Sequence, residues 1–121
     1  MLKIFGAALL AALLAACASP LSGDYAKGHG KTLMVSKRVW SGYQEYVGLI
    51  GGTNRGDFVV TVLNGVALGY HAQYCPGTSC ITVGSRASSL MSECKAEGPQ
   101  VQCVLFAQSS EILVDYKLVD E

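Results

Sequence analysis

The sequence predicts an α+β fold: a small antiparallel sheet of about four strands in two hairpins, with one helix before the sheet and one helix inserted between the hairpins. Three observations support this prediction. Apolar residues recur at helical spacing in two segments, an Asn-Gly pair separates two strand-like runs, and two alternating runs end the chain. In chain order the predicted segments are a helix at 37–50, a hairpin at 57–74, a helix at 85–97 and strands at 101–108 and 111–119.

A stripe of apolar residues predicts the first helix; its members are Trp40, Tyr43, Val47 and Ile50. Ser36 is suited to cap the first turn, whereas Gly42 weakens the interior of the helix. The preceding residues 32–36 fit either a strand or the start of the helix. An aromatic stripe at helical spacing belongs to a core more often than to a glycan-stacking surface, so a core stripe is the favoured interpretation and a glycan surface is the alternative.

The first hairpin is predicted by Asn64-Gly65, a dipeptide typical of a two-residue type I′ turn. In a regular ladder this turn gives the pairs Leu63 with Val66, Thr61 with Leu68, Val59 with Tyr70, and Phe58 with His71. Tyr70 then shares a face with Val59, and His71 lies on the other face with Phe58. We expect His71 to be half-buried with its hydrogen bonds satisfied, and a catalytic base is the alternative.

The second helix carries one apolar stripe, formed by Ala87, Leu90 and Cys94. Gly98-Pro99 is a typical stop signal for a helix. The two alternating runs that follow flank Ser109-Ser110, and we expect them to pair as the second hairpin.

The start of the chain has the pattern of an export signal. Lys3 precedes an uninterrupted run of apolar or small residues from 4 to 14, which is shorter than the roughly 20 apolar residues of a spanning helix. The run ends in Leu14-Ala15-Ala16-Cys17, which closely resembles the lipobox of bacterial lipoproteins. The resemblance implies cleavage before Cys17 and lipid on its thiol, and thus anchoring in a membrane. An ordinary secretory signal with a cysteine at its exit is the alternative.

This resemblance divides the chain into a cleaved signal peptide at 1–16, a lipidated cysteine with a flexible tether at 17–31, and a single α+β domain at 32–121. Ala18 stands where an aspartate would resemble the inner-membrane retention signal of enteric bacteria. In a Gram-negative host we therefore expect an outer-membrane lipoprotein that faces the periplasm or the cell surface.

Five cysteines leave an even number once Cys17 carries lipid. The other four are exported to a compartment where thiols oxidise, so we expect disulfides rather than a metal site. The spacing favours Cys75 with Cys80 and Cys94 with Cys103, because each pair brackets turn residues. Four cysteines allow three connectivities, and the sequence alone does not choose among them.

Charge and motifs argue against several classes of function. The formal net charge is zero, and no run of basic residues exceeds Lys37-Arg38, so we expect no nucleic-acid partner. The sequence contains no G-x-S-x-G or H-E-x-x-H motif and no paired C-x-x-C sets. We therefore expect no enzyme activity, no metal and no cofactor.

The region from Trp40 to Tyr116 resembles a family of small exported bacterial domains of unknown function. The resemblance rests on Trp40-x-x-Tyr43, residues 58–60 before a Gly-containing hairpin, Ala87-x-x-Leu90-x-x-x-Cys94 and residues 103–107. It implies a helix followed by a sheet with a second helix inserted, and it supplies no activity.

These features favour a membrane-anchored, non-catalytic binding or structural module for an envelope protein or complex. The candidate binding surface is formed by Trp40, Tyr43, Tyr70 and His71. A peptidoglycan or glycan contact, or weak glycan hydrolysis, is one alternative, motivated by the aromatic residues. A small inhibitor or immunity-type lipoprotein is another.

Overall fold

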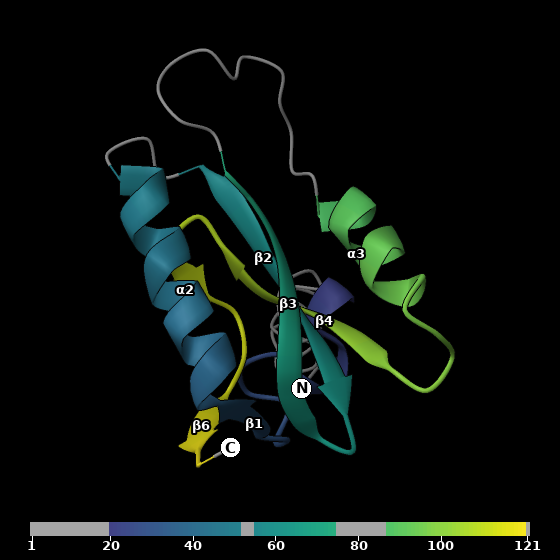
Figure 1. The fold of residues 1–121 in the computed structure, drawn as a ribbon. Helices are drawn as coiled ribbons and strands as arrows, with labels where there is room; N and C mark the ends of the chain where they lie inside the picture. The colour runs from purple at the N-terminus through teal and green to yellow at the C-terminus, as the bar shows by residue number, and fades with distance from the viewer. Residues whose placement is uncertain (1–19, 52–54, 75–86, 121) are drawn as a thin grey trace, which may run out of the picture.

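The structure is a computed structural model that describes residues 20–51, 55–74 and 87–120 (Figure 1). Its elements are η1 (Pro20–Tyr25), β1 (Leu33–Ser36), α2 (Lys37–Ile50), β2 (Gly56–Leu63), β3 (Val66–Tyr74), α3 (Ala87–Lys95), β4 (Gln102–Gln108), β5 (Glu111–Ile112) and β6 (Tyr116–Val119). Both expected helices are present at nearly the predicted positions. Ser36 caps α2 as expected, because its hydroxyl accepts a hydrogen bond from the Val39 N–H.

The strands form one mixed, strongly curled sheet in the order β5-β4-β2-β3-β1-β6, which has the shape of a half-barrel. β1 runs parallel to both β3 and β6, and the remaining pairs are antiparallel. The α+β class and both expected hairpins, β2–β3 and β4–β5, are thus confirmed. The expected sheet of about four antiparallel strands is wrong, because β1 and β6 extend the sheet and pair in parallel. The ambiguous segment 32–36 supplies β1, and the run 111–119 breaks after Ile112 so that only β5 pairs with β4.

The sheet curls around α2 and carries α3 on its opposite face. Near one end of the sheet, Trp40 of α2 stacks on Tyr116 of β6 at 5.4 Å between ring centroids. Near the other end, the Tyr43 hydroxyl donates a hydrogen bond to the Ser110 carbonyl in the turn between β4 and β5. α3 packs on β2 and β4 through Val59 and Leu105.

The main core lies between α2 and the inner face of the sheet. Tyr43, Tyr46 and Ile50 of α2 are buried there, and Trp40 and Val47 pack partly buried at its margin. Phe58 at its centre is fully buried, with the rings of Tyr43, Tyr46, Tyr70 and Phe106 at 5.0–5.9 Å. The aromatic stripe of α2 therefore belongs to the core.

A smaller core lies under α3 and is closed by a disulfide. Ala87, Leu90 and Cys94 face the sheet, as the sequence predicts. Cys94 and Cys103 are bonded, with 5.9 Å between their Cα atoms, which confirms this expected pair. The second expected pair, Cys75 with Cys80, lies outside the described residues.

Residues 20–31, expected to belong to a flexible tether, are part of the folded domain. Tyr25 is only 2% exposed, and the Ser22 hydroxyl donates a 2.6 Å hydrogen bond to the Leu105 carbonyl. The backbone pairs with the segment before β6, where the Asp115 N–H donates to the Tyr25 carbonyl. The glycine- and serine-rich composition concealed this packing, because the buried residues Ser22, Tyr25 and Ala26 form no periodic apolar pattern. The domain therefore begins by residue 20 and not at residue 32.

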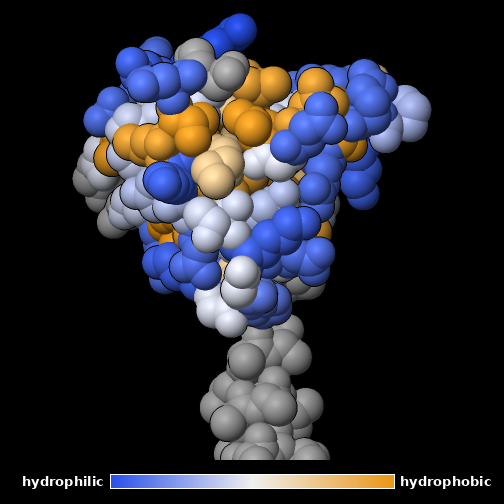
Figure 2. All heavy atoms as spheres, turned by 90° about the horizontal axis from the view of Figure 1, so that it is seen from below, coloured by the Kyte–Doolittle hydropathy of each residue, from blue (hydrophilic) through white to orange (hydrophobic). Residues whose placement is uncertain are grey.

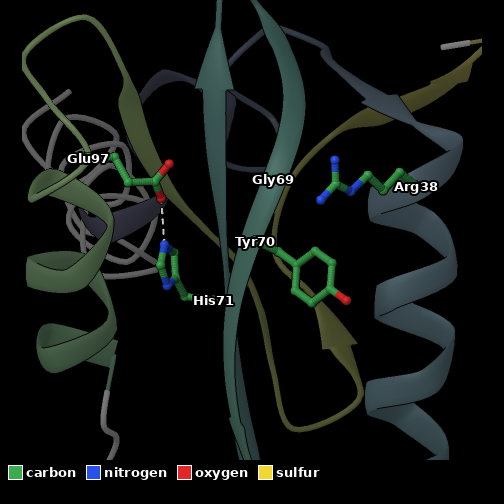
Figure 3. A pocket seen from close by; sticks show the side chains of 5 residues that line it. All are labelled: Arg38, Gly69, Tyr70, His71 and Glu97. Atoms are coloured by element: carbon green, nitrogen blue, oxygen red, sulfur yellow. Dashed lines mark hydrogen bonds and ion pairs between the residues drawn. The ribbon is translucent and has the colours of Figure 1, made fainter.

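The first hairpin has the expected turn and a different register. Asn64 and Gly65 both have positive φ, 53° and 83°, as a type I′ turn requires. A β-bulge then inserts Leu68, so that Thr61 pairs with Gly69 instead of Leu68. Tyr70 consequently pairs with Val60, and His71 pairs with Val59. Since a shift of one residue reverses the faces, Tyr70 turns toward α2 and His71 toward α3 (Figure 3).

Candidate binding groove along the third strand

The outer edge of β3 has no strand partner over most of its length in the described part of the sheet. β1 is short, and it pairs with β3 only at Val66 and Ala67. No strand among residues 20–51, 55–74 and 87–120 pairs with 68–74 on the side away from β2. An edge of this length is a template for pairing with another chain.

The register identifies which backbone groups point outward. The Gly56 carbonyl accepts a hydrogen bond from the Ser109 N–H, so it points toward β4 and away from its partner in β3, Tyr74. Backbone directions alternate along an antiparallel ladder, and the β2–β3 ladder is regular from this pair to Thr61. Tyr70 and Ala72 therefore direct their N–H and C=O groups away from β2, toward the open edge.

A shallow pocket of about 500 Å³ lies over this edge, lined by Arg38, Gly69, Tyr70, His71 and Glu97. Figure 3 shows β3 between the two helices, with Arg38 and Tyr70 on the α2 side and His71 and Glu97 on the α3 side. Gly69 contributes no side chain, which keeps the backbone accessible at the middle of the pocket. We call this feature the β3 groove.

Tyr70 forms the α2 side of the groove and is held by two contacts. Its ring stacks on Phe58 at 5.0 Å with an interplanar angle of 16°. It also lies on the α2 backbone at Gly42, where an added Cβ would come within 2.3 Å of the ring. Gly42 thus weakens the helix but makes room for the ring of Tyr70. Tyr70 remains 39% exposed, and it lines the groove.

His71 forms the α3 side of the groove with two carboxylates. Its Nε2 lies 2.5 Å from Glu97 Oε2, and its Nδ1 lies 3.8 Å from Glu93 Oε1. The Thr61 hydroxyl donates a 3.0 Å hydrogen bond to the same Glu97 oxygen. The hydrogen bond from His71, assisted by the one from Thr61, lowers the pKa of Glu97 below its ordinary value, although partial desolvation opposes the shift. His71 is half-buried with a bound partner, as predicted, but it lies opposite Val59 and not Phe58.

The four residues of the expected binding surface do not share one exposed face, although the rings of Trp40 and Tyr43 lie 5.3 Å apart. Tyr43 is 6% exposed, and its burial raises the pKa of its phenol. Trp40 lies at the margin of the core on Tyr116. Tyr70 and His71 both reach the groove, but from opposite faces of β3. The predicted surface is therefore reduced to these two neighbours in sequence.

Two charged residues of the groove, Arg38 and Glu97, were missed by the sequence analysis. Each stands beside a helix end, Arg38 in the first turn of α2 and Glu97 just after α3. No sequence pattern links two helices that are far apart in the chain. The only available signal was the unfavourable position of a positive charge in the first turn of α2, where it opposes the helix dipole.

Apolar side chains are also exposed at the end of the molecule where β3 begins. They are Leu63, Leu68, Tyr116 and Leu118. Figure 2 views this end and shows apolar residues gathered in a band among hydrophilic ones. From the exposed Leu68 at the bulge, β3 leads into the groove.

Within the described ranges, no group of three or more His, Cys, Asp or Glu residues is arranged to hold a metal ion. The helices described there also include none that is long and apolar enough to cross a membrane. Comparison with protein-family models, curated proteins and solved structures finds no match to this chain.

Proposed function

We propose that the chain is a lipid-anchored lipoprotein of the bacterial envelope that acts as a non-catalytic binding module for an envelope protein or complex. The observation that carries the proposal is the β3 groove, where an open strand edge lies between two helices and is lined by aromatic and charged side chains. Protein-binding sites are enriched in such aromatic and arginine side chains.

The lipid anchor on Cys17 would limit how far the groove can lie from the membrane. Two residues, Ala18 and Ser19, separate Cys17 from Pro20, the first described residue, and the three residue steps between them span about 10 Å when the chain is fully extended. The folded domain would therefore stay next to the lipid headgroups. A partner of the groove would lie at the membrane surface or be anchored in the same membrane.

A glycan or peptidoglycan contact is the second candidate. Its support is the partly exposed Trp40–Tyr116 stack and the exposed ring of Tyr74. Burial of Tyr43 and Tyr46 in the core removes two of the aromatic residues that motivated this alternative. The protein-binding proposal is therefore the stronger one.

Crosslinking in intact envelopes tests the proposal. A tagged full chain is crosslinked in its native host, purified under denaturing conditions, and compared with the Cys17→Ser variant. We expect the lipidated chain to be recovered with the membranes in a covalent complex with one envelope protein, and the Cys17→Ser variant to lose membrane attachment. Recovery of no protein partner above the untagged background would contradict the binding role. Binding of purified peptidoglycan instead would favour the second candidate.

A further inference from the structure

We propose that the β3 groove binds an extended segment of another protein, which adds to the sheet as a strand beside β3. This inference rests on the proposed binding function and specifies its mode and the chemistry of its partner. Strand addition uses main-chain hydrogen bonds for affinity and alternate side chains for specificity.

The backbone of β3 supplies the hydrogen bonds. Tyr70 and Ala72 direct their N–H and C=O groups outward, and Gly69 between the two walls leaves access for an approaching main chain. Side chains of the added strand would alternate between the two faces of the sheet. Those beside Tyr70 and Ala72 would point to the α2 face, and those beside His71 would point to the α3 face.

The walls of the groove define the charge pattern of the added strand. The α3 wall carries Glu93 and Glu97 around a single imidazole, so it is acidic whether His71 is neutral or protonated. The α2 wall carries Arg38 beside the exposed ring of Tyr70. A complementary segment therefore has basic side chains on one face, and apolar side chains with an acidic one on the other.

The same charges argue against a second copy of this chain as the occupant. Antiparallel pairing of two β3 edges would bring the two α3 walls to the same face of the combined sheet. Their four carboxylates would then lie close to each other, and like charges across a pair of strands are destabilising. A strand from a different protein avoids this repulsion.

A synthetic peptide of defined chemistry tests the inference. The probe has about eight residues, in which lysine alternates with valine and one central valine is replaced by aspartate. Its binding to the purified full chain in detergent is measured by fluorescence anisotropy. We expect saturable binding below about 1 mM that weakens with added salt. We also expect much weaker binding of the charge-reversed peptide, in which glutamate replaces lysine and lysine replaces aspartate.

The Ala72→Pro variant removes the outward N–H without breaking a hydrogen bond to β2, because proline is tolerated where a strand's N–H faces away from its neighbour. We expect this variant to weaken peptide binding about tenfold, the effect of losing one hydrogen bond with its partner left unsatisfied. The Ala72→Thr variant keeps the N–H and should bind as the natural chain does. A copy of the peptide methylated on alternate backbone nitrogens makes the same test from the partner's side, so a folding defect of the proline variant does not decide the outcome.

Three results with the purified chain would overturn the inference. One is equal binding of the unmethylated and the methylated peptide. Another is no binding of the unmethylated peptide at about 1 mM. The third is slow hydrogen exchange of the Tyr70 and Ala72 amides in the free protein, since those amides would then already be covered. Envelope crosslinking with the Ala72→Pro variant separates this inference from the proposed function. Equal capture of the partner by both chains leaves the binding function standing and refutes the strand-addition mode, whereas capture by neither refutes the binding function.

Discussion

The contact of Tyr70 with Gly42 gives a quantitative test of the hairpin register. In the bulged register Tyr70 lies on the α2 face, and a Cβ on residue 42 would come 2.3 Å from its ring. In a regular register Tyr70 would lie on the opposite face and could not touch α2. We therefore expect the effect of Gly42→Ala on stability to depend on whether Tyr70 is present.

The magnitude follows from two opposing contributions. Alanine stabilises a helix interior by about 1 kcal/mol relative to glycine. In the natural chain the new methyl group displaces the Tyr70 ring by more than 1 Å from its stack on Phe58, and an aromatic pair contributes about 0.5–1.5 kcal/mol beyond its burial. Gly42→Ala should then leave the natural chain unchanged or slightly less stable, and it should stabilise the Tyr70→Ala chain by about 1 kcal/mol.

A double-mutant cycle measures this coupling. The natural chain, the two single variants and the double variant are unfolded in urea, with the fluorescence of Trp40, the single tryptophan, as the signal. We expect a coupling free energy of about 1 kcal/mol or more. A value below about 0.4 kcal/mol, which is the usual range for independent sites, would refute the register and the placement of Tyr70 in the groove.

Three further predictions concern the core, the α3 wall and the disulfide. Phe58→Ala should lower the free energy of unfolding by about 3–5 kcal/mol in urea denaturation, because it empties a fully buried site among four rings, whereas a loss below about 1.5 kcal/mol would place Phe58 outside the core. His71→Ala should raise the pKa of Glu97 toward its ordinary value in a carboxyl carbon-13 titration. Because the pKa of Glu97 is lowered in the folded state, its ionised form stabilises the fold above the unfolded pKa, and this contribution is lost as the pH falls through the folded pKa. The natural chain should therefore lose more stability than the variant on acidification. An unchanged Glu97 titration would contradict the His71 contact. Replacing Cys94 and Cys103 together by alanine should cost about 2–3 kcal/mol, the closure entropy of their short loop, and unchanged thermal stability would contradict a bonded pair in the natural chain.

The sequence was sufficient for features that depend on local patterns. The stripe through Tyr43 and Ile50 located α2, the cap at Ser36 fixed its start, and Asn64-Gly65 located the first turn. These features follow from the helical period, from capping chemistry and from the backbone preferences of two turn residues.

The features that failed depend on contacts between distant segments. Alternation in the run 111–119 indicated extended structure, but nothing in it specified that β6 would pair in parallel with β1. The bulge at Leu68, beside the glycine at position 69, depends on how β3 pairs with β2, and it decides the faces of Tyr70 and His71. The packing of residues 20–31 depends on contacts of Ser22, Tyr25 and Ala26 with distant segments.

The groove shows the same division between local and distant information. Tyr70 and His71 were identified individually as candidates, because an aromatic residue and a lone histidine in a predicted strand can be recognised from the sequence. Arg38 and Glu97 became part of the site only when α2 and α3 packed on the two sides of β3. The opposite charges of Arg38 and Glu97 on the two walls of the groove are therefore brought together only by the fold.

Site-specific photocrosslinking in living cells tests the binding role of the β3 edge most directly. A photoreactive amino acid is introduced at Ala72, which is exposed on the outer edge, and in a control chain at Gln44, which is exposed on α2. We expect a covalent adduct with an envelope protein from position 72 and none from position 44. An adduct from position 44 alone, or equal adducts from both positions, would contradict the binding role of the β3 edge.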